Sequence, residues 1–133
     1  MRSMFSGCKS LEELNLKSFN TNNVTNMKWM FSYCSSLRVL NVNNFTTNIV
    51  NDMSGMFSCC SFLEELNLKN FNTDNVTNMS YMLCRCSSLK NLEMNNFNNN
   101  NATNVRYMLS GCLDELISKI KIKYKNIKEE AYY

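Results

Sequence analysis

The sequence predicts an α/β solenoid with short parallel strands on one face and short helices on the other. The chain aligns with itself when it is shifted by 26 residues, and its four copies carry the pattern L-x-x-L-x-L or keep it with valine or methionine at the last position. An asparagine-rich phrase recurs at the same spacing, as FNTNNVTNM at 19–27, FTTNIVNDM at 45–53, FNTDNVTNM at 71–79 and FNNNNATNV at 97–105. A fixed period of this length with L-x-x-L-x-L is typical of a leucine-rich-repeat-like solenoid.

The repeat keeps its register without insertion or deletion as far as Cys112. Equivalent positions form columns of one residue type, among them Met4, Met30, Met56, Met82 and Met108; Cys8, Cys34, Cys60, Cys86 and Cys112; Phe19, Phe45, Phe71 and Phe97. We therefore expect four 26-residue repeats plus the start of a fifth in residues 1–112, followed by a C-terminal capping segment in 113–133. No repeat can bury its apolar face alone, so neighbouring repeats must stack to form one core.

The first half of each repeat predicts a short strand. In LEELNL at 11–16, Leu14 and Leu16 alternate with Glu13 and Asn15, which is the period of two expected for a half-buried strand. The equivalent segments LRVLNV, LEELNL and LKNLEM keep this alternation. We expect residues 13–16, 39–42, 65–68 and 91–94 to lie side by side as parallel strands, ~4.8 Å apart.

The second half predicts a short helix. Within 23–34, apolar residues fall at i, i+3, i+4 and i+7, namely Met27, Met30, Phe31 and Cys34. Thr25 precedes this stripe as an expected N-cap, and Val24 as an expected hydrophobic staple. The asparagines of the phrase are then expected to form the turn between strand and helix, because their side chains bond nearby backbone groups.

The C-terminal segment 113–133 leaves the repeat register. A fifth strand would place Ile117, Ile120 and Ile122 at the leucine positions, and the alternation of isoleucine with lysine over 119–125 favours this interpretation. The alternative is a helix that uses an apolar stripe of Leu113, Leu116, Ile117, Ile120 and Ile127. Either element would cover an otherwise open end of the solenoid.

The stretch MFSYCSSLRVLNVNNFTTNIVNDM at 30–53 resembles the 26-residue-repeat bacterial surface proteins, the BspA-like leucine-rich-repeat proteins. Their unit runs close to M-F-x-x-C-x-S-L-x-x-L-[DN]-L-x-x-F-x-T-x-N-V-T-[DN]-M, and the resemblance covers about residues 4–112. It implies a leucine-rich-repeat-like fold, display at the cell surface or secretion, binding of other proteins and no enzymatic activity. The chain departs from the pattern in showing no secretion signal or wall anchor, and in the fourth phrase, which reads NNNNAT.

Composition argues against several function classes. The net charge of +3 is spread thinly, so we expect no nucleic-acid partner. The longest apolar run, at 81–84, is far below the ~18 residues of a membrane span, so we expect none. The chain has no histidine, and no acidic residue in the repeats breaks the pattern, so we expect no catalytic residue and no cofactor. FSGC at 5–8 looks like a lipidation site, but LSGC at 109–112 repeats it.

Seven cysteines raise the question of a metal or disulfide site. Five form the repeat column, where a small buried side chain suits the corner. A zinc site would have to use Cys59, Cys60, Cys84 and Cys86 of adjacent repeats, but C-C and C-x-C are not the usual clamp spacing. We therefore expect no metal site, and no disulfide within the aligned column.

The outer face of the strands is the candidate binding surface. One column alternates in charge, as Glu12, Arg38, Glu64 and Lys90, and a second is formed by Asn15, Asn41 and Asn67. These residues either satisfy one another as a solvated face or form a shallow polar surface for a protein or glycan partner. The first hypothesis for function is a binding module that acts through this face. The alternative is a structural repeat-array fragment with no ligand of its own. Self-association through the solenoid ends is also possible.

Overall fold

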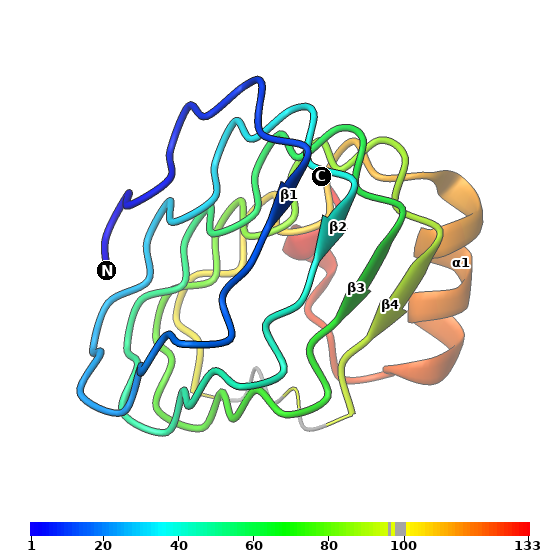
Figure 1. Ribbon diagram of the computed structural model, residues 1–133. Helices are drawn as coiled ribbons and strands as arrows, with labels where there is room; N and C mark the ends of the chain where they lie inside the picture. The colour runs from blue at the N-terminus through cyan, green and yellow to red at the C-terminus, as the bar shows by residue number, and fades with distance from the viewer. Residues whose placement is uncertain (96, 98–100) are drawn as a thin grey trace.

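The chain winds in successive coils that lie side by side, with the strands along one side and a helix at the C-terminal end (Figure 1). The computed structural model describes residues 1–95, 97 and 101–133. Asn98, Asn99 and Asn100 of the fourth asparagine-rich phrase lie outside the described residues. Because the coils lie side by side, residues 26 apart in the sequence are neighbours in space.

Four short strands pair in parallel at this offset. β1 (Glu13–Leu14) pairs with β2 (Val39–Leu40), and β3 (Glu65–Asn67) pairs with β4 (Asn91–Glu93). The register places Leu14 opposite Leu40 and Leu66 opposite Leu92. Within the described residues the strands form two separate two-stranded sheets, because no ladder joins β2 to β3.

The side of the coils opposite the strands is built from turns rather than the helices that the sequence predicted. We call residues 27–34 and their equivalents 53–60, 79–86 and 105–112 the turn ladder. In it, alternate backbone N–H groups donate to carbonyls of the next coil, so that Met27, Trp29, Phe31 and Tyr33 bond to Asp52, Ser54, Met56 and Ser58 at 2.8–2.9 Å. An α-helix would keep those N–H groups for its own carbonyls. The helix prediction was therefore wrong for residues 23–34.

Two columns of left-handed backbone make the turn ladder possible. Trp29 and Tyr33 have φ of 57° and 59°, and all five positions of each column share this sign. The column of Trp29 is Ser3, Trp29, Gly55, Tyr81 and Tyr107, and that of Tyr33 is Gly7, Tyr33, Cys59, Arg85 and Gly111. A residue in the left-handed region ends a right-handed helix. The apolar stripe that suggested the helix is nevertheless fully buried, at Met27, Met30, Phe31 and Cys34.

The repeated phrase bonds the coils to one another as well as turning the chain. No helix follows Thr25 or Val24, so neither residue acts as an N-cap or staple. Instead, Asn26 Oδ1 accepts the backbone N–H of Lys28 at 3.0 Å and forms an Asx turn. Other polar side chains of the phrase reach the preceding coil, as when Thr77 Oγ1 donates to the Asn51 carbonyl at 3.2 Å. Asparagine is thus used both within coils and between them.

The core consists of columns of identical side chains in contact. The rings of Phe5, Phe31 and Phe57 are stacked at centroid distances of 5.5 and 5.7 Å, and Phe45 stacks with Phe71 at 6.5 Å. Most of these rings are completely buried from the second coil onward. Each coil therefore contributes one layer to a continuous apolar column.

The C-terminal segment is helical, so the favoured fifth strand at 117–122 was wrong. α1 (Asp114–Lys123) buries Leu116 and Ile120, one helical turn apart, while Ile122 is left 77% exposed. Strand alternation would have placed Ile120 and Ile122 on the same face, but a helix separates them. Figure 1 shows α1 lying alongside β4, at the end of the row of strands.

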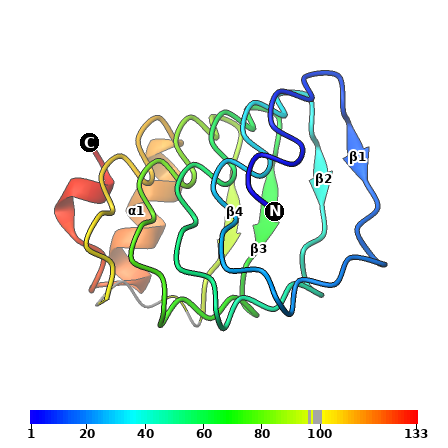
Figure 2. The same ribbon diagram turned by 90° about the vertical axis from the view of Figure 1, so that its left-hand side faces the viewer.

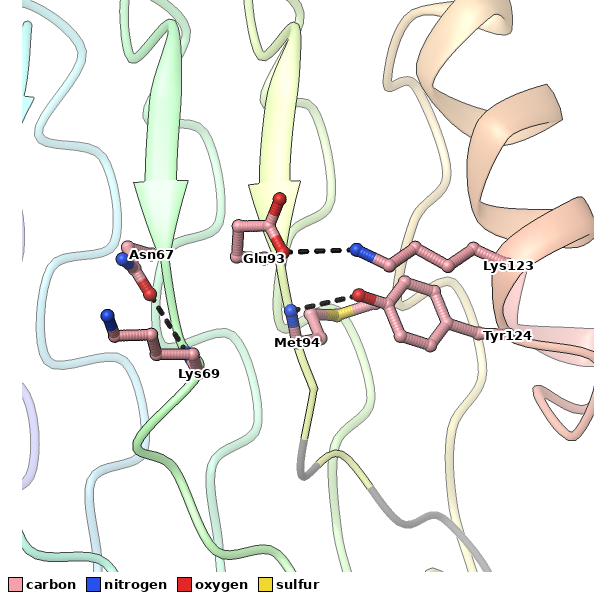
Figure 3. A network of polar contacts seen from close by, with 6 residues as sticks. All are labelled: Asn67, Lys69, Glu93, Met94, Lys123 and Tyr124. Carbon is pink, nitrogen blue, oxygen red and sulfur yellow. Dashed lines mark hydrogen bonds and ion pairs between the residues drawn. The ribbon is translucent and has the colours of Figure 1, made fainter.

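Side chains of this segment bond to the last coil where a further strand would otherwise pair. The Tyr124 hydroxyl accepts the Met94 backbone N–H at 3.1 Å, and Lys123 Nζ pairs with Glu93 at 3.0 Å (Figure 3). The short 3-10 helix η1 (Glu129–Ala131) meets the other side of the coil, where the Glu130 carbonyl accepts from Tyr107 N–H at 3.0 Å. Residues 113–133 therefore cover both the strand side and the turn ladder at this end.

Candidate functional site

Two residues of the charge-alternating column on the strand face, Glu64 and Lys90, form an ion pair. Lys90 Nζ lies 2.8 Å from Glu64 Oε2, and both side chains are more than half exposed. The hydrogen bond from Lys90 lowers the pKa of the Glu64 carboxyl, and the same contact raises the pKa of Lys90. Arg38 instead lies over the Phe62 ring, with Cζ 5.2 Å from the centroid. Among the described residues, Glu12 has no ion pair.

A hollow of about 560 Å³ lies on the strand face and is lined by residues of β2, β3 and β4. We call it the β2–β3 hollow, and its lining includes Arg38, Val39, Asn41, Glu64, Glu65 and Asn67. The lining thus combines one cation, three carboxylates (Glu93 is the third) and several carboxamides with an apolar side chain, Val39, that is 66% exposed. This arrangement offers apolar contact in the centre and polar bonds at the edge.

The hollow brings together four of the seven residues that the sequence indicated, namely Arg38, Asn41, Glu64 and Asn67. Asn15 and Asn41 line a smaller hollow of about 300 Å³ beside β1, and Lys90 lines one of about 270 Å³ between β4 and α1. Glu12 lines none of these hollows. The predicted columns are therefore not one continuous site.

The asparagine column also has a structural role that the sequence did not reveal. Asn15, Asn41 and Asn67 each accept, through Oδ1, the backbone N–H two residues further on, at 3.0–3.1 Å. Figure 3 shows this bond from Asn67 to Lys69 at the end of β3. These Asx turns end the strands and turn the chain away from the sheet. Each carboxamide oxygen already accepts one bond, so its Nδ2 donors and its second lone pair are what remain for a ligand.

Two apolar residues of the strand side were missed. Phe62 is 49% exposed in a column where the other coils have Ser10, Ser36 and Ser88. Val39 occupies a column that elsewhere holds Glu13, Glu65 and Asn91. The signal was present in the sequence as an apolar residue in an otherwise polar column.

From the second coil onward the cysteine column consists of buried thiols, whereas Cys8 of the first coil is exposed. Cys60 Sγ donates to the Phe31 carbonyl at 3.2 Å, and Cys86 Sγ donates to Phe57 at 3.1 Å. Burial raises the pKa of Cys60 and Cys86 well above the usual thiol value. A zinc ligand must be a thiolate, whereas these buried thiols donate to backbone carbonyls. No group of three or more metal-ligating side chains occurs among the residues that the structure describes.

The other two cysteines considered for zinc lie outside the core. Cys59 and Cys84 are partly exposed on the turn ladder, where Cys59 N–H donates to the Cys84 carbonyl at 2.8 Å. Their separation from Cys60 and Cys86 follows from position in the coil, since the column cysteines point inward and these two do not. The four sulfurs therefore do not converge on one point.

Comparison with known proteins adds the family. A family model described as "Mycoplasma protein of unknown function, DUF285" matches residues 1–121, which include all the coils and most of α1. Comparison with curated proteins and with solved structures found no match. Within the described residues, no helix is long and apolar enough to cross a membrane. The chain is a repeat protein and belongs to the family described as Mycoplasma protein of unknown function, DUF285.

Proposed function

We propose that the chain is a non-enzymatic binding module that contacts a protein partner through its strand face, centred on the β2–β3 hollow. In this proposal the coils are the units of a leucine-rich-repeat-like solenoid, displayed at the cell surface or secreted, as the resemblance to BspA-like proteins implies. The observation that carries it is the exposure of Val39 and Phe62 beside Arg38 and Glu64.

Covering the exposed apolar side chains of this face with a partner is favourable in free energy, because it removes them from water. Burying an apolar side chain is worth roughly 1.5–3 kcal/mol, so Val39 and Phe62 together give an incoming surface a substantial gain. Arginine and aromatic residues are over-represented among the residues that dominate protein interfaces. Arg38 already lies over Phe62, so its side chain loses little freedom when a partner binds.

The charges around the apolar pair give specificity. Among the described residues Arg38 forms no close ion pair, although its charge helps to lower the pKa of Glu64, so its guanidinium can still contact an acidic group of a partner. Glu64 is paired with Lys90, so that part of the face is already neutralised. We therefore expect a partner with an apolar centre and an acidic group that reaches Arg38.

The proposed absence of catalysis rests on the chemistry of the available groups. The chain has no histidine, and the buried thiols are held protonated by burial. Neither a general base near neutral pH nor a thiolate nucleophile is then supplied by these groups.

The test is binding to a panel of purified host-surface and matrix proteins, by surface plasmon resonance with the full chain immobilised. Phe62→Ser restores the residue that three other coils carry at this position, and Val39→Glu restores the residue of β1 and β3. Each change should weaken binding at least about tenfold, since such contacts are worth ~1.4 kcal/mol or more. Arg38→Gln should weaken it as well.

Two matched control variants test whether a loss of binding is specific to the β2–β3 hollow. Ile122→Ser removes an exposed apolar residue on α1, and Glu12→Gln removes a charge of the same column outside the β2–β3 hollow. Both should bind like the wild type. A structural array fragment without its own ligand would bind nothing on the panel, and a glycan ligand would bind only to glycosylated members. Binding that is equal in wild type and Phe62→Ser would contradict the proposed face.

A further inference from the structure

The turn ladder carries a second surface, on the side of the coils away from the strands (Figure 2). An open trough of about 650 Å³ runs across several coils there. One wall is a row of rings, in which Trp29 and Tyr81 have centroids 6.4 Å apart and Tyr81 and Tyr107 have centroids 5.1 Å apart. The facing wall contains Tyr33, which is 51% exposed, and Arg85.

The ring row is continuous because Gly55 leaves room for Trp29. Gly55 occupies the same column one coil further on, and a Cβ built there would lie 2.0 Å from Trp29 Cε3. The indole therefore fills the space that a side chain at position 55 would occupy, and it reaches toward Tyr81, two coils away. Without this glycine the wall would be interrupted between Trp29 and Tyr81.

The floor and walls of the trough are rich in donors. Serine hydroxyls of the column that includes Ser32 and Ser58 line its floor, and Arg85 is the charged residue of its lining. Its described lining residues include no carboxylate and no carboxamide. Ser32 Oγ is completely buried and, within the described structure, has no hydrogen-bond partner. An unbonded buried hydroxyl is costly, so it marks a place where a ligand acceptor would be favourable.

The backbone spacing of the wall formed by Tyr33 and Arg85 matches one kind of extended peptide. Coils lie ~4.8 Å apart, so the backbones of these two residues, two coils apart, are separated by ~9.6 Å. The rings of the opposite wall lie closer, with the centroids of Trp29 and Tyr81 6.4 Å apart. A polyproline II helix rises ~3.1 Å per residue with three residues per turn, so residues i and i+3 are ~9.3 Å apart on one side. A peptide in this conformation along the trough would present every third residue to the same surroundings.

Proline also matches the donor-rich lining. A proline has no backbone N–H, and the carbonyls of a polyproline II helix are not bonded internally, so such a peptide offers acceptors almost alone. Aromatic-lined grooves are the recognised surroundings for this ligand class. We propose that the trough of the turn ladder binds a proline-rich segment of another protein in the polyproline II conformation. These 133 residues contain no proline, so the same residues of a second copy cannot supply the segment.

The single tryptophan of the chain supplies a direct test. Decaproline is titrated into the full wild-type chain while the emission of Trp29 is recorded, with a glycine–serine peptide of equal length and cellohexaose titrated in parallel. A saturable change with decaproline alone, with Kd at or below ~1 mM, is the expected result. No saturable change with decaproline, an equal response to the glycine–serine peptide, or saturation by the sugar alone overturns the proposal.

Two variants test whether decaproline binds in the trough. Tyr33→Asn and Arg85→Asn remove a ring and a guanidinium while keeping a residue that tolerates the left-handed backbone, with φ of 59° at both positions. Each should raise the Kd for decaproline about fivefold or more. Neither should lower the urea unfolding midpoint as far as the replacement of a buried side chain such as Phe71 would. Phe62→Ser on the strand face should leave it unchanged, so the outcome is independent of the proposed strand-face function. An unaltered Kd in both trough variants, with the fold retained, also overturns the proposal.

Discussion

Replacing Phe71 by alanine should destabilise the chain more than removing a polar contact of the repeated phrase around it. The ring is 1% exposed and stacks with Phe45 at 6.5 Å and 11°. Its backbone is held on both sides, since Phe71 N–H donates to Leu68 and Asn72 N–H to Thr47 Oγ1. The surroundings therefore cannot collapse into the cavity, and we expect a loss of ~3–5 kcal/mol. With a urea slope of ~2 kcal/mol/M, the midpoint falls by ~2 M.

The matched controls are two variants, one that removes an exposed phenylalanine and one that removes a single hydrogen bond. Phe62→Ser removes a half-exposed ring and should change the free energy of unfolding by less than ~1 kcal/mol. Thr77→Ala removes the bond to the Asn51 carbonyl, worth ~0.5–1.5 kcal/mol. Urea titrations followed by Trp29 emission and by far-UV circular dichroism give all three values. The reasoning fails if Thr77→Ala or Phe62→Ser proves as damaging as Phe71→Ala.

Three further predictions concern the turn ladder, the C-terminal segment and the thiols. Gly55→Ala should lower the free energy of unfolding by ~1–3 kcal/mol in a urea titration, because φ is +60° and the new Cβ displaces the Trp29 ring. In the double variant with Trp29→Ala, the two losses should be less than additive. Deleting 113–133 should lower the unfolding midpoint and cause concentration-dependent association in light scattering, because the open edge would pair with other chains; a monomer of equal stability would contradict this. Burial raises the pKa of Cys34 to about 11 and of Cys112 to about 12, from 9.0. Their contribution to stability is full below pH 9 and should be lost as the pH rises through these values, which urea titrations between pH 8 and about pH 11 would detect.

The sequence by itself determined which residues are neighbours and which are buried. Because the period is constant, Leu14 meets Leu40 and Leu66 meets Leu92 at an offset of 26 residues. The apolar stripe of Met27, Met30, Phe31 and Cys34 was also correctly placed in the core. Such inferences succeed because burial depends on the side chain's own polarity and on the repeat that aligns it.

Only the tertiary structure decided how the backbone between those residues is bonded. The stripe fits a helix and a turn ladder equally well, since both place the same four side chains inward. The ladder is formed because a neighbouring coil offers carbonyls to alternate N–H groups, as Ser54 does to Trp29. The left-handed residues that this requires include tryptophan, tyrosine, cysteine and arginine, so glycine alone could not reveal the two columns.

The C-terminal segment was likewise decided by contacts remote in sequence. Alternation over 119–125 indicated a strand, but a helix buries Leu116 and Ile120 together and brings Tyr124 to the Met94 N–H. The same holds for the strand face. Its columns could be listed from the sequence, but only the structure shows that Arg38, Glu64 and Val39 line one hollow while Glu12 does not. Local pattern specifies polarity along the chain, whereas hydrogen bonding between coils selects the backbone conformation and the shape of the surface.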